Sequence, residues 1–244
     1  MNKQNLSRRN FIKRTAQFGI ILGGTGIAVS NPHILGSLTS AKTFSFLDSL
    51  IDEGLLQNAP TARYWISTST KNVNCLNCHS RDEVEINKPY KHNEDIIKCL
   101  LCAQGCIIKN GEKGKCRARV NINGKLKSLV YGHPVAIHID PIEKKPFYHF
   151  LPGAEAYSLA TAGCPLSCKF CQNWEISQAK PEDFSTNFIP PETIAQTSYK
   201  KNVPVIAFTY NEPTVFTEYL IDIAKYAKEK RIRSVLISCG FMNS

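Results

Sequence analysis

CPLSCKFC, at residues 164–171, places Cys164, Cys168 and Cys171 at C-x-x-x-C-x-x-C spacing, with no fourth thiol in the loop. A cubane [4Fe-4S] cluster needs four ligands, usually four thiolates. Three cysteines therefore leave one iron open to a small molecule. Two other interpretations stay open: a structural zinc site, and a ferredoxin cluster whose fourth cysteine lies elsewhere in the chain. Zinc sites mostly use paired C-x-x-C elements, which this loop does not have.

The residues around the loop predict an α/β fold. Residues 157–162 form a short apolar, β-prone run that ends at Gly163, directly before the first thiol. Further along, residues 203–210 read as a buried strand, 214–230 as an amphipathic helix and 234–239 as a third strand. Alternation of this kind predicts a parallel sheet with right-handed crossovers.

The longer run GCPLSCKFCQNWEISQ, at residues 163–178, resembles the radical S-adenosylmethionine (SAM) superfamily. Within it, the run is similar to the radical SAM member of the AmmeMemoRadiSam group, whose members are relatives of pyruvate formate-lyase activating enzymes. LVYG at 129–132, DPIEKKP at 140–146 and HFLPG at 149–153 are similar to the same group. The resemblance covers about residues 95–244 and is strongest over 126–178.

This resemblance implies a partial (β/α) radical SAM barrel, with SAM bound at the open iron through its amino and carboxylate groups. Such a barrel resembles six βα units of about 30 residues each. Residues 157–244 hold about three of them, so we expect a barrel that is truncated at its C-terminus. The cluster ligands implied are Cys164, Cys168 and Cys171.

Other site residues follow from the resemblance. Phe170 would lie against the adenine region of SAM. Asn211-Glu212-Pro213 occupies the place where activating enzymes carry Gly-Gly-Glu, so Asn211 and Glu212 are expected to bind SAM, with Glu212 accepting hydrogen bonds from its ammonium group. Only the glutamate matches, and the alternative is an acid near a helix N-terminus. Gln172 and Trp174 are expected to shape the loop, and Cys239 to be a buried structural thiol.

The implied activity is that of an enzyme. One electron from the reduced cluster would cleave the SAM sulfonium, giving methionine and a 5′-deoxyadenosyl radical that abstracts hydrogen from substrate. The protein would supply the open iron, the orientation and the exclusion of water. The implied partners are a reducing electron donor and a substrate, either a protein glycyl residue or a small molecule. The alternative function is an exported electron-transfer protein with several iron–sulfur centres and haem c.

A second group of thiols lies upstream, in the order Cys99-x-x-Cys102-x-x-x-Cys106 and then Cys116. Four thiols this close together can close on one metal, and their spacing fits zinc and an auxiliary iron–sulfur cluster equally well. Reduced structural cysteines are the third interpretation. All ten cysteines lie between positions 75 and 239, mostly in metal-like clusters, so disulfides are the weaker interpretation.

A third group, Cys75-Leu76-Asn77-Cys78-His79, satisfies the C-x-x-C-H pattern for covalent attachment of haem c. A small metal site that uses Cys75, Cys78 and either His79 or His92 explains the same residues.

The N-terminus predicts export. SRRNFIK at residues 7–13 matches the twin-arginine (Tat) consensus, and a mildly apolar stretch follows at 18–30. At roughly thirteen residues it is shorter than the ~20 that a membrane span needs, and it reads as a signal-peptide core. We therefore expect the Tat translocase as a partner and a periplasmic or membrane-associated location. The alternative is a basic N-terminal helix of a cytoplasmic protein.

Composition fits a globular protein with a sizeable core, since 43% of residues are hydrophobic and 20% are charged. The net charge is +10, of which five charges lie in the first 14 residues. The remaining +5 is ordinary, and the chain has no aromatic-basic RNA motif, so we expect no nucleic-acid partner.

The expected domain order follows from these features. Residues 1–30 are the signal, and 31–74 a linker with a short amphipathic helix that carries Leu47, Leu50, Ile51 and Leu55 on one face. Residues 75–153 form a Cys-rich metal-binding module, with a hairpin at 120–131 whose turn, Asn123-Gly124, requires two positive φ angles. Residues 154–244 form the first half of the barrel.

Overall fold

The structure, a computed structural model, describes residues 53–67 and 96–243, which belong to one compact unit, Thr43–Ser244. The Tat signal and most of the helix expected around Leu47, Leu50 and Ile51 lie outside these ranges. The proposed haem or metal residues Cys75, Cys78, His79 and His92 also lie outside the described residues.

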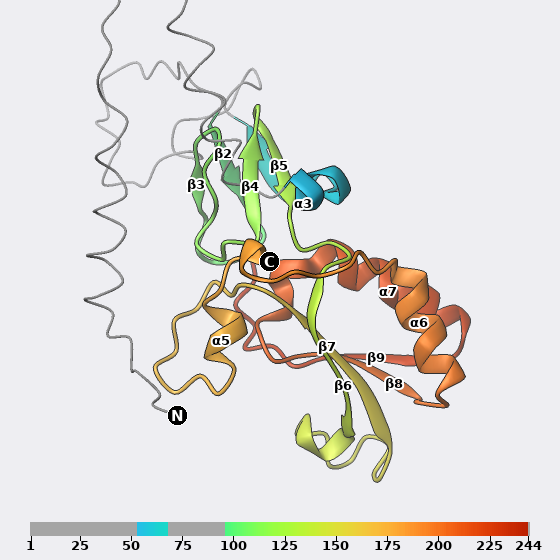
Figure 1. Cartoon of the computed structure of the whole chain (residues 1–244). Coiled ribbons are helices and arrows are strands. Elements are labelled where there is room, and N and C mark those ends of the chain that lie inside the picture. Colours follow the sequence, from blue (N-terminus) through green and yellow to red (C-terminus); the bar gives the residue numbers. More distant parts are fainter. Residues whose placement is uncertain (1–52, 68–95, 244) are drawn as a thin grey trace, which may run out of the picture. The chain divides into compact units, whose positions relative to one another are not determined.

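The main sheet has four strands in the order β6-β7-β8-β9 (Figure 1). Strands β7, β8 and β9 are parallel, which confirms the prediction from the alternating pattern. β8 and β9 are shorter than the expected 203–210 and 234–239. The bounds are β6 (Pro134–Pro141), β7 (Glu155–Thr161), β8 (Val205–Phe208) and β9 (Arg233–Leu236).

Strand β6 extends the sheet beyond the boundary expected from the sequence. The sequence predicts a Cys-rich module up to residue 153, but the structure pairs β6 antiparallel with β7, His138 opposite Ser158. The sheet therefore begins about twenty residues earlier, at Pro134. β6 is a half-exposed edge strand. Its partner β7 follows in the chain after the short 3-10 helix η2 (Ile142–Lys144) and a loop.

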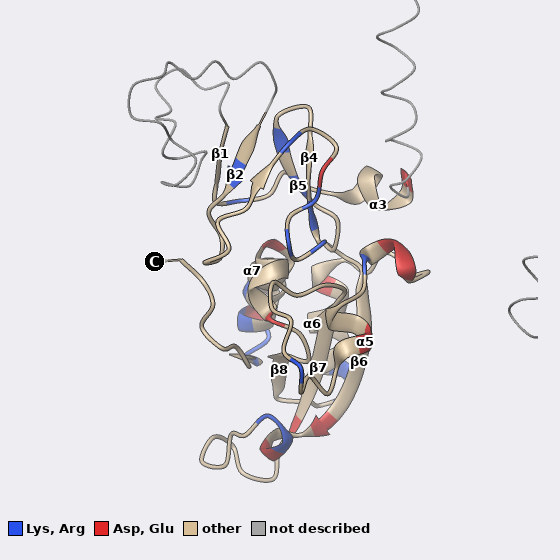
Figure 2. Cartoon of the chain, turned by 90° about the vertical axis from the view of Figure 1, so that its left-hand side faces the viewer, with Lys and Arg blue, Asp and Glu red and all other residues tan. Residues whose placement is uncertain are grey.

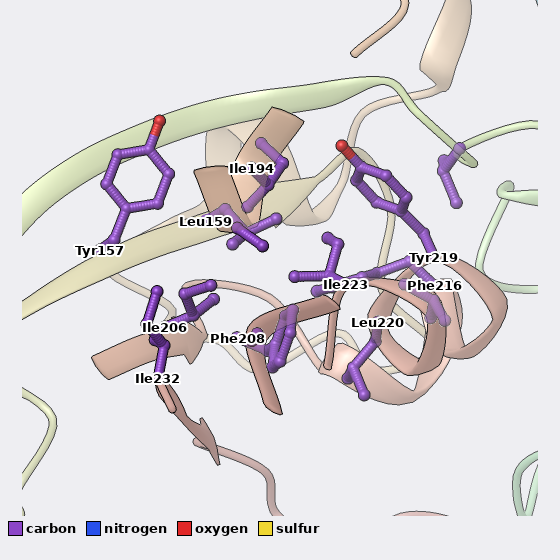
Figure 3. Packing of buried hydrophobic residues seen from close by; sticks show 14 of the residues in the cluster. Tyr157, Leu159, Ile194, Ile206, Phe208, Phe216, Tyr219, Leu220, Ile223 and Ile232 are labelled. Atoms are coloured by element: carbon purple, nitrogen blue, oxygen red, sulfur yellow. The ribbon is translucent and has the colours of Figure 1, made fainter. Parts of the chain in front are cut away.

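Two helices cover one face of the parallel strands. α6 (Pro191–Lys200) begins with proline at its first turn, where a missing N–H costs nothing, and α7 (Thr217–Glu229) follows the 3-10 helix η4 (Pro213–Phe216). Figure 3 shows Leu159, Ile206 and Phe208 of the strands packed against side chains of α7 and η4. The opposite face holds a smaller cluster of Ile142, Ala156, Val205 and Ala207, packed against residues of the β6–β7 connection.

The residues before β6 form two small antiparallel units. β1 (Trp65–Ser67), β2 (Ile97–Cys99) and β3 (Ile107–Ile108) make one sheet, and β4 (Arg119–Ile122) and β5 (Lys125–Ser128) make a hairpin. The hairpin turn is confirmed, since Asn123 has φ 50° and Gly124 has φ 73°. β1 belongs to this sheet although the sequence predicts a linker there. Leu55 of the short helix α3 (Glu53–Asn58) packs on the hairpin.

Acidic and basic residues are interspersed along the described part of the chain (Figure 2). Within residues 53–67 and 96–243, none of the helices has the length and apolar character needed to cross a membrane. The remaining short elements are α5 (Trp174–Ser177) and the 3-10 helix η3 (Pro181–Asp183).

Candidate functional site

The three loop cysteines lie at the carboxyl-terminal edge of the parallel strands. Cys164 follows the end of β7 by three residues, Asn211 and Glu212 follow β8, and Ser238 follows β9. Open α/β sheets and barrels bind ligands at this edge, because the loops after successive strands meet there. The structure therefore brings the predicted cluster ligands and the predicted SAM-binding residues to the same edge.

Gly163 sets the path of the loop. Its φ is +90°, and its N–H donates to the Ile176 carbonyl at 2.9 Å. A Cβ at this position would lie 2.1 Å from the carbonyl oxygen of Cys116, so the backbone of the Cys-rich module rests directly on the glycine. Only glycine accommodates both the backbone angle and the contact.

The loop thiols differ in exposure. Cys164 is buried, Cys168 is exposed and Cys171 lies between, with its Sγ 3.3 Å from Ser177 Oγ. Burial raises the pKa of the Cys164 thiol. None of the eight described cysteines forms a disulfide. Phe170 projects into solvent with 89% of its surface exposed.

The donor set of this loop fits an iron–sulfur cluster in its chemistry. Three unpaired thiols lie on one short loop, and two of them are at least partly exposed. As they stand, no three Cys, His, Asp or Glu side chains within residues 53–67 and 96–243 are gathered closely enough to hold a metal ion. Binding would therefore require the thiols to rotate toward a common centre, as is usual where metal binding and local folding are coupled.

Asn211 fixes the start of the loop. Its side-chain amide donates to the carbonyls of Thr161 at 2.8 Å and Gly163 at 2.7 Å. Its Oδ1 is buried and has no hydrogen-bond partner in the described part of the chain. A buried acceptor without a partner is uncommon, so this atom is a candidate for a ligand donor.

Glu212 joins the loops after β8 and β9. Its Oε1 accepts hydrogen bonds from the Thr214 and Ser238 hydroxyls, both at 2.7 Å, and its Oε2 accepts one from the Cys239 N–H at 3.0 Å. It also caps η4 through the Thr214 N–H, which matches the helix-terminal alternative. Burial alone would raise the pKa of Glu212, but the hydrogen bonds from Cys239, Thr214 and Ser238 outweigh it and lower the pKa.

Cys239 is exposed, so the expectation of a buried thiol is wrong. β9 ends at Leu236, and Cys239 lies in the following loop, where its Sγ is 3.0 Å from Glu212 Oε2. Sequence reasoning missed Ser238 as a partner of Glu212. The signal available was a hydroxyl near the end of the predicted strand 234–239.

Two amide side chains hold the cluster loop. Gln172 and Trp174 are exposed, whereas Gln178 donates to the Leu166 carbonyl at 2.9 Å and Asn173 donates to the Tyr210 carbonyl at 3.0 Å. Both lie within the run that resembles the radical SAM motif. Gln178 thereby holds the first half of the loop, and Asn173 joins the end of the loop to the segment after β8.

A polar cluster that the sequence did not predict ties β6 to the loop after β8. Lys145, with a buried side chain, lies 2.7 Å from Asp140 Oδ2, and the Tyr210 hydroxyl donates to the same oxygen at 2.5 Å. Burial alone would raise the pKa of Asp140, but the hydrogen bonds from Lys145 and Tyr210 lower it to about 2.

The structure also brings the second group of cysteines together. Its four members line one small cavity, along with residues that include Arg119 and, from the cluster loop, Pro165. Burial raises the pKa of three of these thiols, that of Cys116 to about 12. The cavity is lined by Cys99, Cys102, Cys106 and Cys116.

Comparison with known proteins finds similarities to this chain. Residues 158–244 match the model of the Radical SAM superfamily, whose chemistry depends on SAM and an iron–sulfur cluster. An uncharacterized protein of Methanocaldococcus jannaschii is 41% identical over 152 residues. The alignment covers 62% of this chain and 46% of that protein, so the chain spans about half the length of the relative it matches. No solved structure matches the chain.

Proposed function

We propose that the protein is a radical SAM enzyme of the activating-enzyme-like, AmmeMemoRadiSam type. The observation that carries the proposal is a three-thiol loop at the carboxyl edge of β7–β9, within residues that match the Radical SAM model. When bound, a [4Fe-4S] cluster would supply the electron that cleaves SAM to methionine and a 5′-deoxyadenosyl radical, which abstracts hydrogen from substrate. Its protein ligands would be Cys164, Cys168 and Cys171.

The remaining residues would bind and orient SAM. Phe170 offers an exposed aromatic ring beside the last two thiols, suited to the adenine. Asn211 Oδ1 is an unpartnered acceptor next to the loop, suited to an ammonium group. Glu212 already accepts hydrogen bonds from Thr214, Ser238 and Cys239. We propose that it acts on SAM chiefly by fixing the two loops between which the cofactor would lie.

The test is reductive cleavage of SAM by the full-length protein, reconstituted with iron and sulfide without oxygen. Replacing any one of Cys164, Cys168 or Cys171 by alanine should abolish formation of 5′-deoxyadenosine. Cys239→Ala is the matched control, because the backbone N–H of residue 239 still binds Glu212. Persistent 5′-deoxyadenosine in the loop variants would overturn the assignment. An electron paramagnetic resonance spectrum unchanged by SAM would favour the electron-transfer alternative.

We further propose export by the Tat translocase, on the basis of SRRNFIK at residues 7–13. Replacing Arg8 and Arg9 together by lysine should retain the protein in the cytoplasm. Fractionation of cells decides this prediction, and a wild-type protein that is cytoplasmic and uncleaved would contradict it.

A further inference from the structure

The cavity lined by the second group of cysteines is small, and apolar residues such as Leu101, Ile108 and Val215 complete its lining. Cys99 ends β2, Cys102 lies in the following turn, Cys106 precedes β3 and Cys116 precedes β4, so different segments deliver the four thiols. The cavity measures about 10 Å³, which is close to the space of one water molecule. A space of this size accommodates a single ion.

Backbone N–H groups lie near the four sulfurs. Those of Leu101, Gln104 and Ala118 act to lower the pKa of the Cys99, Cys102 and Cys116 thiols, although burial outweighs them. The Lys115 N–H donates to Cys106 Sγ at 3.4 Å. A thiol is a weak acceptor, but a thiolate gains from each such donor. Outer-shell hydrogen bonds of this kind orient and stabilise metal ligands.

Arg119 supplies a buried positive charge on the same cavity. Its side chain is almost fully buried, and its Nη2 donates to Glu218 Oε2 at 2.6 Å. Its Nε has no hydrogen-bond partner in the described part of the chain. A buried donor on a cationic group costs free energy when it has no hydrogen-bond acceptor, and a neighbouring thiolate would supply that acceptor.

We propose that Cys99, Cys102, Cys106 and Cys116 hold one zinc ion in a closed, structural site. Four thiolates around zinc are a common structural site, and such sites have no open position. Because the thiols are not gathered around one point as they stand, binding would draw them together from their present positions around the cavity. The amides and Arg119 would offset the negative charge of four thiolates around one divalent ion.

The zinc site would also support the loop of the first three cysteines. The Cys116 carbonyl rests on Gly163, and Gln104 Nε2 donates to the Pro165 carbonyl at 2.9 Å. Gly163 and Pro165 flank Cys164. The two cysteine groups thus share a backbone contact, so occupancy of the zinc site would order residues 163–171. This inference goes beyond the proposed function and holds whether or not the loop cleaves SAM.

Metal analysis of the full-length protein, purified without oxygen, tests the site. We expect one equivalent of zinc in the wild type, and the same amount in a variant in which Cys164, Cys168 and Cys171 are all replaced by alanine. Cys102→Ser should lose most of the zinc, whereas Cys75→Ser with Cys78→Ser should retain it. Iron with acid-labile sulfide at this site in the variant without loop cysteines would overturn the proposal, as would the absence of stoichiometric metal.

A second variant separates loss of the ligand from loss of the fold. Cys106→His should keep the zinc, since zinc accepts three thiolates and one imidazole, and Cys106 is the most accessible of the four. Substitution by cobalt(II) should give thiolate-to-cobalt absorption in the wild type that changes in Cys106→His. Zinc retention in Cys106→His with cobalt absorption identical to that of the wild type would exclude Cys106 as a ligand and so overturn the four-thiol site.

Hydrogen exchange tests the support of the loop. In the variant without loop cysteines, removal of zinc should speed exchange in residues 163–171 by at least about tenfold, because the Cys116 contact loosens. Residues 191–200 of α6 form the internal control, since no residue of that helix lines the cysteine cavity. Equal exchange in the loop with and without zinc would refute the structural coupling and leave the metal assignment to the elemental analysis.

Discussion

Replacing Glu218 by glutamine should destabilise the protein strongly. Glu218 Oε2 lies 2.6 Å from Arg119 Nη2, and the side chains are 4% and 2% exposed. Its Oε1 accepts the Arg63 N–H at 2.6 Å. Glutamine keeps the side-chain shape and one hydrogen-bond acceptor but, in protein freed of zinc, leaves the guanidinium buried without its counter-charge. Removing one partner of a buried pair costs about 3–5 kcal/mol, and we expect the unfolding free energy to fall by that amount.

Urea unfolding of the full-length protein measures the effect, with the free energy extrapolated linearly to water. The double variant Arg119→Met with Glu218→Gln should recover much of the loss, because no unpaired charge is then buried, and the coupling should be at least about 2 kcal/mol. Lys225→Ala is the surface control. Its exposed pair with Asp222 should contribute no more than about 0.5 kcal/mol. A loss below about 1 kcal/mol for Glu218→Gln would refute the reasoning and indicate that another group balances Arg119.

Two further changes test other contacts. Gly163→Ala should lower stability by about 2 kcal/mol or more and SAM cleavage on the order of 100-fold, because the new Cβ would lie 2.1 Å from the Cys116 carbonyl at φ +90°. Gly153→Ala, at φ +78° with nothing within 4 Å, carries only the backbone cost and should leave SAM cleavage unchanged. Asp140 has a lowered pKa of about 2, so its contribution to stability is present above its unfolded value of 3.8 and is lost as pH falls toward 2. Asp140→Asn should lower the urea midpoint at pH 7 but not at pH 2, and an equal loss at both pH values would contradict this.

Local patterns in the sequence predicted the parts of the fold that depend on neighbouring residues. The strand before Gly163, the parallel pairing of the later strands and the turn at Asn123-Gly124 all follow from short-range rules, and the structure confirms them. The edge strand β6 was missed although its residues lie within the resemblance. Its role depends on pairing with β7 across a connection, and the residues of the strand itself do not encode the partner.

In the candidate site, too, the sequence predicted the features that depend on neighbouring residues and missed the contacts between distant ones. Sequence spacing identified which cysteines form each group, and the structure places one group around a single cavity and the other on a single loop. Sequence spacing could not show that Ser238, 26 residues away, donates a hydrogen bond to Glu212, or that Cys116 contacts Gly163. These contacts join segments far apart in the chain, and they are set by how the elements pack. The identity of each metal stays a prediction.

The contact between Gly163 and the Cys116 carbonyl limits how far this protein can be divided into interchangeable parts. In a chimera that joins β6–β9 to a different N-terminal segment, Gly163 would keep its left-handed φ but would have no backbone carbonyl packed against it. A chimera that keeps the Cys-rich segment but takes its cluster loop from elsewhere would need glycine at the same place. Recombination between relatives should therefore succeed only where the cluster loop carries glycine at this position and the N-terminal segment supplies the backbone that packs against it.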